Sequence, residues 1–373
     1  MTSMRFDSYW TATAPRFTGA AAGPVEGSYD VAVVGGGFTG LSAARRLAMA
    51  GAKVALLEAG KVASAASGRN GGHLNNGLAH SYLAAKAQLG EARAKALYRA
   101  FDESIVTIET IIAEDGIDCA FRRAGKLKLA SKPGHVAGLR ENFEAVHREV
   151  DPDTAFLTRE DLKDEIVSPA FHGAMLSKKS AMMHMGRFGA GLADAVARRG
   201  VSIYEDAPVT QLREENGRRL LITPRGALTA KEALIATGAQ TTANFAWFRR
   251  RIVPVGSFVI ATRPLSDDEI AASLPGNRTY VTSLNIGNYF RLAPDKRLIF
   301  GGRARFSAIS DQRSDARSGE ILRASLAALL PQLASAEIDY CWGGLVDMTK
   351  DRFPRAGRHD GLWYAMGYSG HGA

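Results

Sequence analysis

The sequence has 373 residues, of which 46% are hydrophobic and 23% charged, a composition typical of a folded chain of about two domains and not of a disordered one. The formal net charge is +9, but the basic residues are dispersed, so we expect a solvated basic surface and no nucleic-acid-binding function. Two cysteines exclude a disulfide framework and a four-cysteine zinc site, and no apolar stretch is long enough to span a membrane, which together predict a cytoplasmic protein.

The first regular pattern follows an arm, residues 1–29, whose composition predicts irregular structure. A continuous β-branched run at 29–34 predicts a buried strand, and it leads into a glycine-rich turn at 35–40. Apolar residues then recur at helical spacing over 41–48, before a second strand predicted at 53–58. These elements form a β-α-β unit of about 30 residues.

The rest of the chain alternates between helical and strand-forming patterns. Helices are predicted at 82–115, 135–149, 187–199 and 317–331. Strands are predicted at 126–130, 201–204, 209–213, 220–223, 231–236, 253–262, 280–283, 289–292, 297–301, 337–348 and 362–366. Because strands and helices are mixed in this order, two interleaved domains are expected in preference to two in tandem.

The turn at 35–40 matches G-x-G-x-x-G in a context that favours nucleotide binding: it follows a strand, opens a helix and precedes Glu58 at the end of the next strand. In this motif Gly35 permits the tight turn, Gly37 lets a pyrophosphate approach the backbone, and Gly40 lets helix and strand pack closely. The helix N-terminus attracts phosphates. Glu58 is placed to accept hydrogen bonds from a ribose 2′-hydroxyl, which disfavours NADP.

A second small, polar loop follows at 66–73, with the sequence A-S-G-R-N-G-G-H. In this loop Arg69 would add positive charge to phosphates, while Asn70 and the glycine N–H groups could reach a flavin ring edge. The loop therefore favours a cofactor larger than NAD. A second dinucleotide motif and a redox C-x-x-C are both absent from the sequence, which disfavours a disulfide reductase, whereas a simple NAD dehydrogenase stays open on the residues alone.

With these motifs the sequence resembles the D-amino-acid-oxidase-like FAD-dependent amine oxidoreductases, and within them the γ-glutamylputrescine oxidoreductase-like branch, over nearly its whole length. The S-G-R-N-G-G loop at 67–72 is the most branch-specific feature. The resemblance also rests on Ser8-Tyr9-Trp10, on 31–40 with Glu58, and on the segments 207–209, 236–239, 289–292, 300–303, 342–354 and 367–372.

The resemblance implies an α/β fold, with a Rossmann-like FAD/NAD(P)-binding domain interleaved with a mixed β-sheet substrate domain, the D-amino-acid-oxidase / glutathione-reductase-2 type. We expect the arm at 1–29, the FAD-binding domain at 30–120, 187–250 and 355–373, and the substrate domain at 121–186 and 251–354. The family's C-terminal helix is expected to be missing, because the sequence ends at Ala373.

The resemblance also implies a reaction, the oxidation of an amine, with putrescine catabolism as its setting. The neutral amine gives a hydride to flavin N5 of a non-covalent FAD, the imine hydrolyses, and O2 reoxidises the flavin to give H2O2. The small-molecule amine is γ-glutamylputrescine or a related compound. The alternatives are a sarcosine-, glycine- or D-amino-acid-type oxidase or dehydrogenase and, from another class, a truncated chain without catalytic activity.

Candidate site residues follow from the motifs and the resemblance together. His73 and His371 are the catalytic candidates, and His73 has three interpretations: a hydrogen-bonding group at the flavin edge, a covalent flavin attachment, or a structural histidine. No metal site is predicted. The substrate-binding candidates are Tyr289, Arg291, Arg303 and Trp342, although buried aromatic residues and single arginines are more often structural. The cofactor-binding candidates are Gly35, Gly36, Gly37, Phe38, Thr39, Gly40, Glu58, Ala59, Ser67, Gly68, Arg69, Asn70, Gly71, Gly72, Val209, Thr237, Gly238, Gly370, His371 and Gly372.

Overall fold

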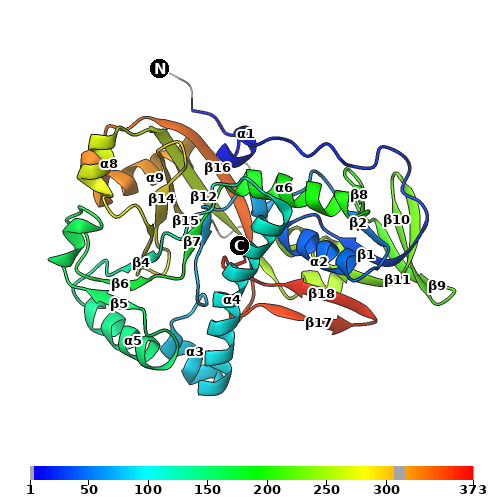
Figure 1. Ribbon diagram of the computed structural model, residues 1–373, viewed down its shortest axis with the longest axis horizontal. Helices are drawn as coiled ribbons and strands as arrows, with labels where there is room; N and C mark the ends of the chain where they lie inside the picture. Colours follow the sequence, from blue (N-terminus) through cyan, green and yellow to red (C-terminus); the bar gives the residue numbers. More distant parts are fainter. Residues whose placement is uncertain (1–3, 306–315, 373) are drawn as a thin grey trace.

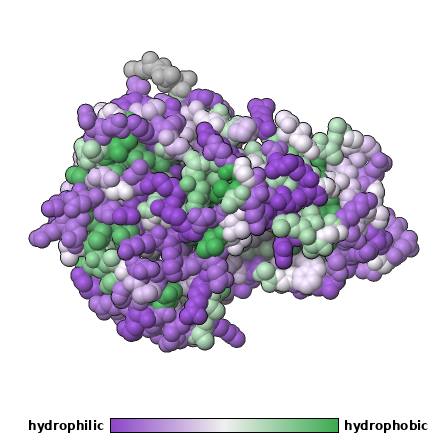
Figure 2. Space-filling model, in the orientation of Figure 1, coloured by the Kyte–Doolittle hydropathy of each residue, from purple (hydrophilic) through white to green (hydrophobic). Residues whose placement is uncertain are grey.

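The computed structural model describes residues 4–305 and 316–372, except for the side chains of residues 303 and 305. Two eight-stranded sheets lie next to each other, one in each half of the molecule, and a small two-stranded sheet completes the strands (Figure 1). Within the described ranges, none of the helices combines the length and apolar character needed to cross a membrane. The face shown in Figure 2 is largely hydrophilic, with apolar residues in separate patches.

The first sheet contains the predicted β-α-β unit. Strand β1 pairs in parallel with both β2 and β11, and α2, which covers Phe38–Met49, connects β1 to β2. The strand order is β17-β18-β11-β1-β2-β8. In addition, β10 pairs with β11, and β9 pairs with β10. This arrangement confirms the Rossmann-like half of the prediction. The strands are β1 Ser28–Val34, β2 Val54–Leu57, β8 Ser202–Tyr204, β9 Gln211–Glu215, β10 Arg218–Thr223, β11 Gly226–Ile235, β17 Arg355–His359 and β18 Leu362–Met366.

The second sheet is mixed, as predicted. Its order is β16-β12-β15-β14-β13-β4-β6-β5, and all neighbours are antiparallel except β4 and β13. The strands are β4 Lys126–Leu129, β5 Ala155–Leu157, β6 Ala174–Ser177, β12 Val253–Pro264, β13 Thr279–Thr282, β14 Tyr289–Leu292, β15 Arg297–Arg305 and β16 Ile338–Met348. The two-stranded sheet pairs β3 His73–Leu74 with β7 Ala181–Met182.

Helices cover the sheets, and one predicted helix is divided in two. The pattern at 82–115 gives α3 and α4, because Gly90 between them has a φ of 79°, outside the helical region. The α-helices are α1 Tyr9–Ala12, α3 Tyr82–Leu89, α4 Glu91–Asp115, α5 His135–Glu149, α6 Met185–Arg198, α7 Ala246–Arg249, α8 Asp267–Ser273 and α9 Ala316–Leu329. The short 3-10 turns are η1 Ala66–Gly68, η2 Asp161–Asp164, η3 Gly238–Gln240, η4 Ala243–Phe245 and η5 Pro331–Leu333.

The N-terminal arm is more ordered than its composition predicts. It contains α1, in which Tyr9 and Trp10 are almost fully buried, and the Trp10 indole donates a 2.6 Å hydrogen bond to the carbonyl of Asn70. Tertiary contacts therefore stabilise an arm whose local sequence does not predict regular structure. For the same reason, the sequence patterns missed α8 and the short strands β3, β5, β6, β7 and β17.

One apolar cluster connects the two halves and fixes how their sheets meet. It includes Val33 of β1, Phe188 of α6 and Trp342 of β16, all nearly inaccessible to solvent. A second cluster, with Leu127, Phe258 and Leu322, packs α9 on the second sheet. The other face of that sheet is therefore left to face the first half. The division into the predicted domain segments stays a prediction.

Candidate active site

A large cavity lies where the two halves meet. It is lined by the strand ends of the first sheet and by strands of the second, and part of it is open to solvent. Its volume of about 390 Å3 lies within the roughly 300–1,000 Å3 typical of sites for small ligands. We call the part beside α2 the nucleotide end and the part beneath β13 and β14 the substrate end.

The nucleotide end is built by the glycine-rich turn between β1 and α2. Gly37, Phe38 and Thr39 line the cavity there, at the first turn of α2, where N–H groups have no partner within the helix. Gly35 has a φ of 110° and lies so close to β11 that a Cβ would be 2.5 Å from the Ala236 carbonyl oxygen. A Cβ on Gly40 would overlap the carbonyl oxygen of Gly35, so the helix approaches the strand as the motif predicts.

Glu58 anchors this turn from the end of β2. Its carboxylate accepts hydrogen bonds from the backbone N–H of Gly36 at 2.6 Å and of Gly60 at 2.8 Å. Burial raises the pKa of the Glu58 carboxyl, and the two N–H groups oppose that rise. Since Glu58 also lines the cavity, its carboxylate stands where the motif places the ribose-binding acid.

Most of the predicted cofactor-binding residues meet at this cavity. Those that line it are Gly35, Gly37, Phe38, Thr39, Glu58, Ala59, Ser67, Arg69, Asn70, Gly71, Val209, Thr237, Gly238, Gly370, His371 and Gly372. Four predicted residues do not line it: Gly36, Gly40, Gly68 and Gly72. At Gly68 and Gly72 a Cβ would overlap the Ala63 carbonyl oxygen and the Arg291 guanidinium, so these glycines allow close packing behind the wall.

The S-G-R-N-G-G loop is held together by its own side chains. The Asn70 amide donates to the Ser67 carbonyl at 2.9 Å and accepts from the N–H of Gly72 at 2.8 Å. Ser67 Oγ accepts from the N–H of Phe38 at 3.0 Å, which links this loop to the first turn of α2. The Arg69 guanidinium donates to the Gly343 carbonyl, and burial lowers its pKa. The two sequence motifs are therefore adjacent parts of one wall.

At the substrate end, Tyr289 and His73 stand edge to face, with ring centroids 5.5 Å apart. The Tyr289 hydroxyl is 3.3 Å from Ser257 Oγ, and both residues line the cavity. His73 Nε2 is 3.2 Å from the Phe290 carbonyl, so the neutral ring with its proton on Nε2 donates there. Burial, together with the charge of Arg291, lowers the pKa of His73 to about 3. His73 is therefore uncharged at neutral pH.

His371 lines the cavity from the loop after β18. Its Nδ1 lies 3.4 Å from the Ser369 carbonyl. Burial and the nearby charges of Lys126, Lys128 and Arg352 lower the pKa of His371 to about 4. Both catalytic candidates are therefore neutral imidazoles, which can accept or donate hydrogen bonds but do not carry a positive charge at neutral pH.

Two of the predicted substrate-binding residues have a different role in the structure. Arg291 is 1% exposed, and its guanidinium donates to the carbonyls of Gly71, Leu292 and Met183 at 3.1, 3.0 and 2.6 Å. It does not line the cavity, and its donors already have protein partners. Trp342 is fully buried and donates to the Arg69 carbonyl at 2.9 Å. These two residues support the wall from behind. The Arg303 side chain lies outside the described part of the chain.

Sequence reasoning missed several residues that line the cavity. Asn75, Ser257, Val281 and Asp347 line the cavity, and none belongs to a dinucleotide motif. The alternation of side chains along β12 and β13 separates cavity-facing from core-facing positions, but only the sheet register identifies which face is which. Among the described residues, no group of three or more His, Cys, Asp or Glu side chains is arranged to hold a metal ion.

The cavity wall fits FAD by its own geometry. The first turn of α2 provides backbone N–H groups for phosphates, and the only close neighbour of a Cβ on Gly37 would be Ser67 Oγ at 3.0 Å. Glu58 stands where a ribose-binding carboxylate would be needed, and the cavity continues past Asn70 to Tyr289. A dinucleotide would therefore have its phosphates at α2 and its reactive ring toward the second sheet.

Comparison with known proteins identifies the family of the chain. The family model described as "FAD dependent oxidoreductase" (DAO) matches residues 30–373. The probable oxidoreductase OrdL of Haemophilus influenzae is 34% identical over 350 residues, which cover 92% of this chain and 79% of the relative. The γ-glutamylputrescine oxidoreductase of Escherichia coli is 33% identical over 345 residues, which cover 92% and 80% respectively.

Solved structures show the same fold. The glycine oxidase of Geobacillus kaustophilus superposes with a TM-score of 0.76 and 26% identity, over 92% of this chain and 90% of that one. The L-proline dehydrogenase of P. horikoshii gives a TM-score of 0.79 over 93% and 90%, at 19% identity, and it supports the fold alone. With a family model that spans most of its length and relatives above 30% identity, the chain belongs to the DAO family and is an FAD-dependent oxidoreductase.

Proposed function

We propose that the protein oxidises the C–N bond of a small amine, with γ-glutamylputrescine or a related amine as its substrate. The observation that carries the proposal is the continuity of the cavity, which joins the nucleotide-binding turn to an uncharged polar pocket around Tyr289. One of the relatives is named as a γ-glutamylputrescine oxidoreductase, and this supports the choice of substrate. The catalytic and cofactor-binding roles given to individual residues are part of the proposal.

The substrate end favours an amine in its neutral form. Within the described lining, Glu58 and Asp347 are the carboxylates, whereas the part around His73, Asn75 and Tyr289 has none. Burial raises the pKa of the Asp347 carboxyl, and its Oδ2 already accepts the N–H of Gly367 at 2.6 Å. An ammonium group would lose its hydration in this pocket without gaining a counter-charge. The amine therefore binds after losing its proton.

When bound, FAD supplies a two-electron oxidant that accepts a hydride from the carbon beside the nitrogen. The residues of the chain hold and orient the amine: Tyr289 and Ser257 offer hydroxyl groups, and His73 offers an uncharged imidazole. The His73 ring is held through Nε2 by the Phe290 carbonyl, and its Nδ1 side lies against Gly71. We assign His73 a hydrogen-bonding role and regard the flavin as non-covalently bound.

The proposal has two further parts. The acceptor that reoxidises the flavin is O2, with H2O2 as the product. The location is the cytoplasm, which is supported by two buried cysteines, Cys119 and Cys341, a usage typical of proteins kept under reducing conditions.

The test combines a flavin spectrum with an amine panel. FAD-loaded protein is mixed anaerobically with γ-glutamylputrescine, putrescine, sarcosine, glycine and D-alanine, and flavin absorbance is followed before air is admitted and peroxide is measured. Bleaching by γ-glutamylputrescine with peroxide on reoxidation is expected. Bleaching by sarcosine or glycine alone would favour the alternative oxidase. Bleaching by NADH alone, or protein that takes up no FAD, would overturn the proposal.

A pair of variants ties the result to the nucleotide end. Gly37→Asp introduces a carboxylate where the phosphates would lie, and we expect it to abolish FAD uptake by charge repulsion. Gly23→Asp introduces the same charge at an exposed position where a Cβ meets nothing within 4 Å. This control is expected to take up FAD and to bleach like the unmodified protein.

A further inference from the structure

The cavity-facing side of the second sheet carries two lysines next to each other on β4. Lys126 and Lys128 alternate with Leu127 and Leu129, whose side chains pack in the cluster beneath α9. Because successive side chains in a strand point to opposite faces, the two lysines point to the cavity side. Both are partly buried, and burial lowers the pKa of Lys126 to about 8 and also lowers that of Lys128.

Register places Lys128 directly beside the substrate end. Lys128 pairs with Val281 across β4 and β13, and Val281 pairs with Tyr289 across β13 and β14. Directly paired residues place their side chains on the same face, and neighbouring strands are about 4.8 Å apart. Val281 and Tyr289 both line the cavity, so the flexible four-carbon stem of Lys128 needs to cross a single strand spacing to reach it.

A third cation, Arg352, is adjacent. Its positive charge contributes to the lowered pKa of both Lys128 and His371, the cavity-lining histidine. Arg352 is exposed and has a φ of 59°, in the left-handed region that residues with a Cβ rarely adopt, and its N–H donates to the Thr349 carbonyl at 3.2 Å. Such conformations are concentrated at functional sites.

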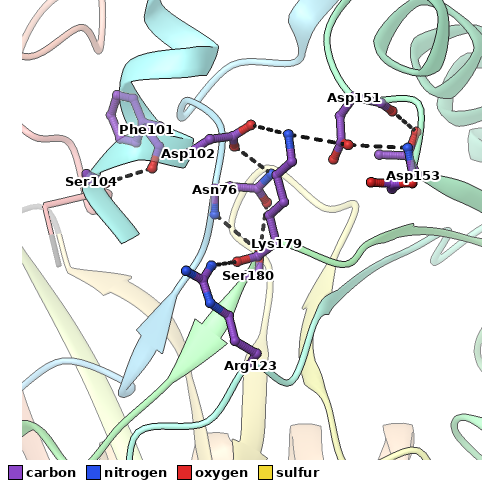
Figure 3. Close-up of polar contacts among 10 residues, drawn as sticks. Asn76, Phe101, Asp102, Ser104, Arg123, Asp151, Asp153, Lys179 and Ser180 are labelled. Atoms are coloured by element: carbon purple, nitrogen blue, oxygen red, sulfur yellow. Dashed lines mark hydrogen bonds and ion pairs between the residues drawn. The ribbon is translucent and has the colours of Figure 1, made fainter. Parts of the chain in front are cut away.

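The acidic groups nearby are already paired with other residues. Figure 3 shows Asp102 between Asn76 and Lys179, with distances of 3.0 and 2.9 Å, while Asp151 lies 3.4 Å from the same lysine. Asp351 pairs with Arg355 at 2.6 Å.

The two lysines of β4 and Arg352, which lie behind the cavity lining, differ from Lys179 in this respect. Lys126 Nζ donates to the Asn76 carbonyl at 2.6 Å. In the parts of the chain that the structure describes, the Lys128 and Arg352 side chains form no ion pair, in contrast to Lys179. A partly buried cation without a counter-charge opposes folding, and an anionic ligand would offset this cost.

We propose that Lys128, with Arg352 beside it, binds a carboxylate carried by the amine substrate. This inference rests on the proposed function and narrows it: the substrate class becomes amines that bear a carboxylate. Since Lys128 lies one strand beyond the cavity-lining Val281, the carboxylate is held on the β4 side of the substrate end. γ-Glutamylputrescine has a primary amine at one end and, at the other, an α-amino acid group that includes a carboxylate, whereas putrescine lacks the carboxylate.

The test compares these two amines on FAD-loaded enzyme. Lys128→Met keeps most of the aliphatic stem and removes the charge, and we expect kcat/KM for γ-glutamylputrescine to fall about 10- to 100-fold, as for loss of a hydrogen bond to a charged group. Putrescine oxidation should change less than about threefold. Arg352→Gln, at an exposed position, should reduce the preference for γ-glutamylputrescine over putrescine by a smaller factor. Lys128→Arg, which keeps the positive charge, should retain part of the preference that Lys128→Met loses.

Glutarate provides a readout apart from turnover. Its dissociation constant is measured by calorimetry on the holoenzyme at constant ionic strength. In Lys128→Met this constant should rise at least tenfold, by roughly the same factor as the loss in kcat/KM. The matched control is Lys163→Met in η2. Lys163 is exposed, and its neighbour Leu162 packs on the opposite face of the sheet. This variant should change neither the kcat/KM values nor the glutarate dissociation constant. Equal losses for both amines, or unchanged glutarate binding in Lys128→Met, would overturn the proposal.

Two further results separate this inference from the proposed function. If Lys128→Met lowers the oxidation of glycine and sarcosine as much as that of γ-glutamylputrescine, the proposal holds, and the bound carboxylate is that of an amino acid. If the enzyme oxidises none of the amines while Lys128→Met still abolishes glutarate binding, the proposed function fails and the anion site remains.

Discussion

The two ends of the cavity are built in different ways. At the nucleotide end, a β-α-β unit and the loop that follows it provide much of the wall, and the important positions there are glycines where the backbone approaches another group closely. At the substrate end, β12, β13, β14 and β16 each contribute one or a few side chains, β3 adds His73, and the loop after β18 adds His371. The comparison shows that close backbone approach leaves a local sequence pattern, whereas a pocket assembled from separate strands does not.

The largest expected effect is at the nucleotide end. Gly40→Ala places a Cβ over the carbonyl oxygen of Gly35, and we expect a loss of unfolding free energy of about 3 kcal/mol, the upper range for overpacking, together with loss of bound FAD. Flavin content after purification and a urea titration measure both. Gly138→Ala in α5, where a Cβ meets nothing within 4 Å, is the control and should be neutral or slightly stabilising. Normal FAD content in Gly40→Ala would show that close packing there is dispensable.

Arg291 tests whether the substrate end depends on a structural support behind it. Arg291→Met leaves three buried carbonyls without their donor, and we expect a loss of about 2 kcal/mol or more in unfolding free energy. Arg291→Lys should not restore it, because an ammonium group lacks the planar fork of donors. Kinetics on the surviving enzyme should show equal losses for γ-glutamylputrescine and putrescine. A selective loss of the carboxylate-bearing amine would instead make Arg291 a substrate ligand.

The substrate end also predicts a pH dependence of stability. The pKa values of His73 and His371 are lowered to about 3 and about 4 in the folded protein, so the unfolded state takes up protons first as the pH falls below about 6.5. Stability should therefore decrease from about pH 6.5 toward pH 4, by at most about 1.4 kcal/mol per pH unit for each histidine. Urea titrations at pH 7, 6 and 5 measure this. The double variant His73→Asn/His371→Asn should show a weaker decrease, and an unchanged slope would refute the assignment.

The smallest effect is expected at Tyr289. Tyr289→Phe removes a hydroxyl that lies 3.3 Å from Ser257 and keeps the ring that covers Gly71 and Gly301. Loss of one hydrogen bond predicts a decrease of about 1 kcal/mol in stability and less than a tenfold change in kcat/KM. Tyr289→Ala, which also removes the ring, should reduce kcat/KM much further. Equal effects of the two variants would show that the hydroxyl, and not the ring, shapes the pocket.

The sequence by itself determined the nucleotide half of this protein. The strand at 29–34, the turn at 35–40 and the acid at Glu58 are neighbours in the chain, and their spacing alone gives the β-α-β geometry that the structure has. The second loop, at 66–73, is also recognisable from its small and polar residues, and the structure places that loop against the first turn of α2 through Ser67. The local sequence was enough to predict this half because each of these features contacts residues that are close to it in the chain.

Only the tertiary structure decided the substrate half. Arg291 and Lys128 are both single basic residues on short strands of the second sheet, and no local pattern distinguishes them. The fold directs Arg291 to three backbone carbonyls behind the wall and leaves Lys128 beside the cavity, without an ion pair in the part of the chain that the structure describes. The reason is physical: a strand residue's surroundings depend on its register and on which face is covered, and both are set by segments far away in the chain.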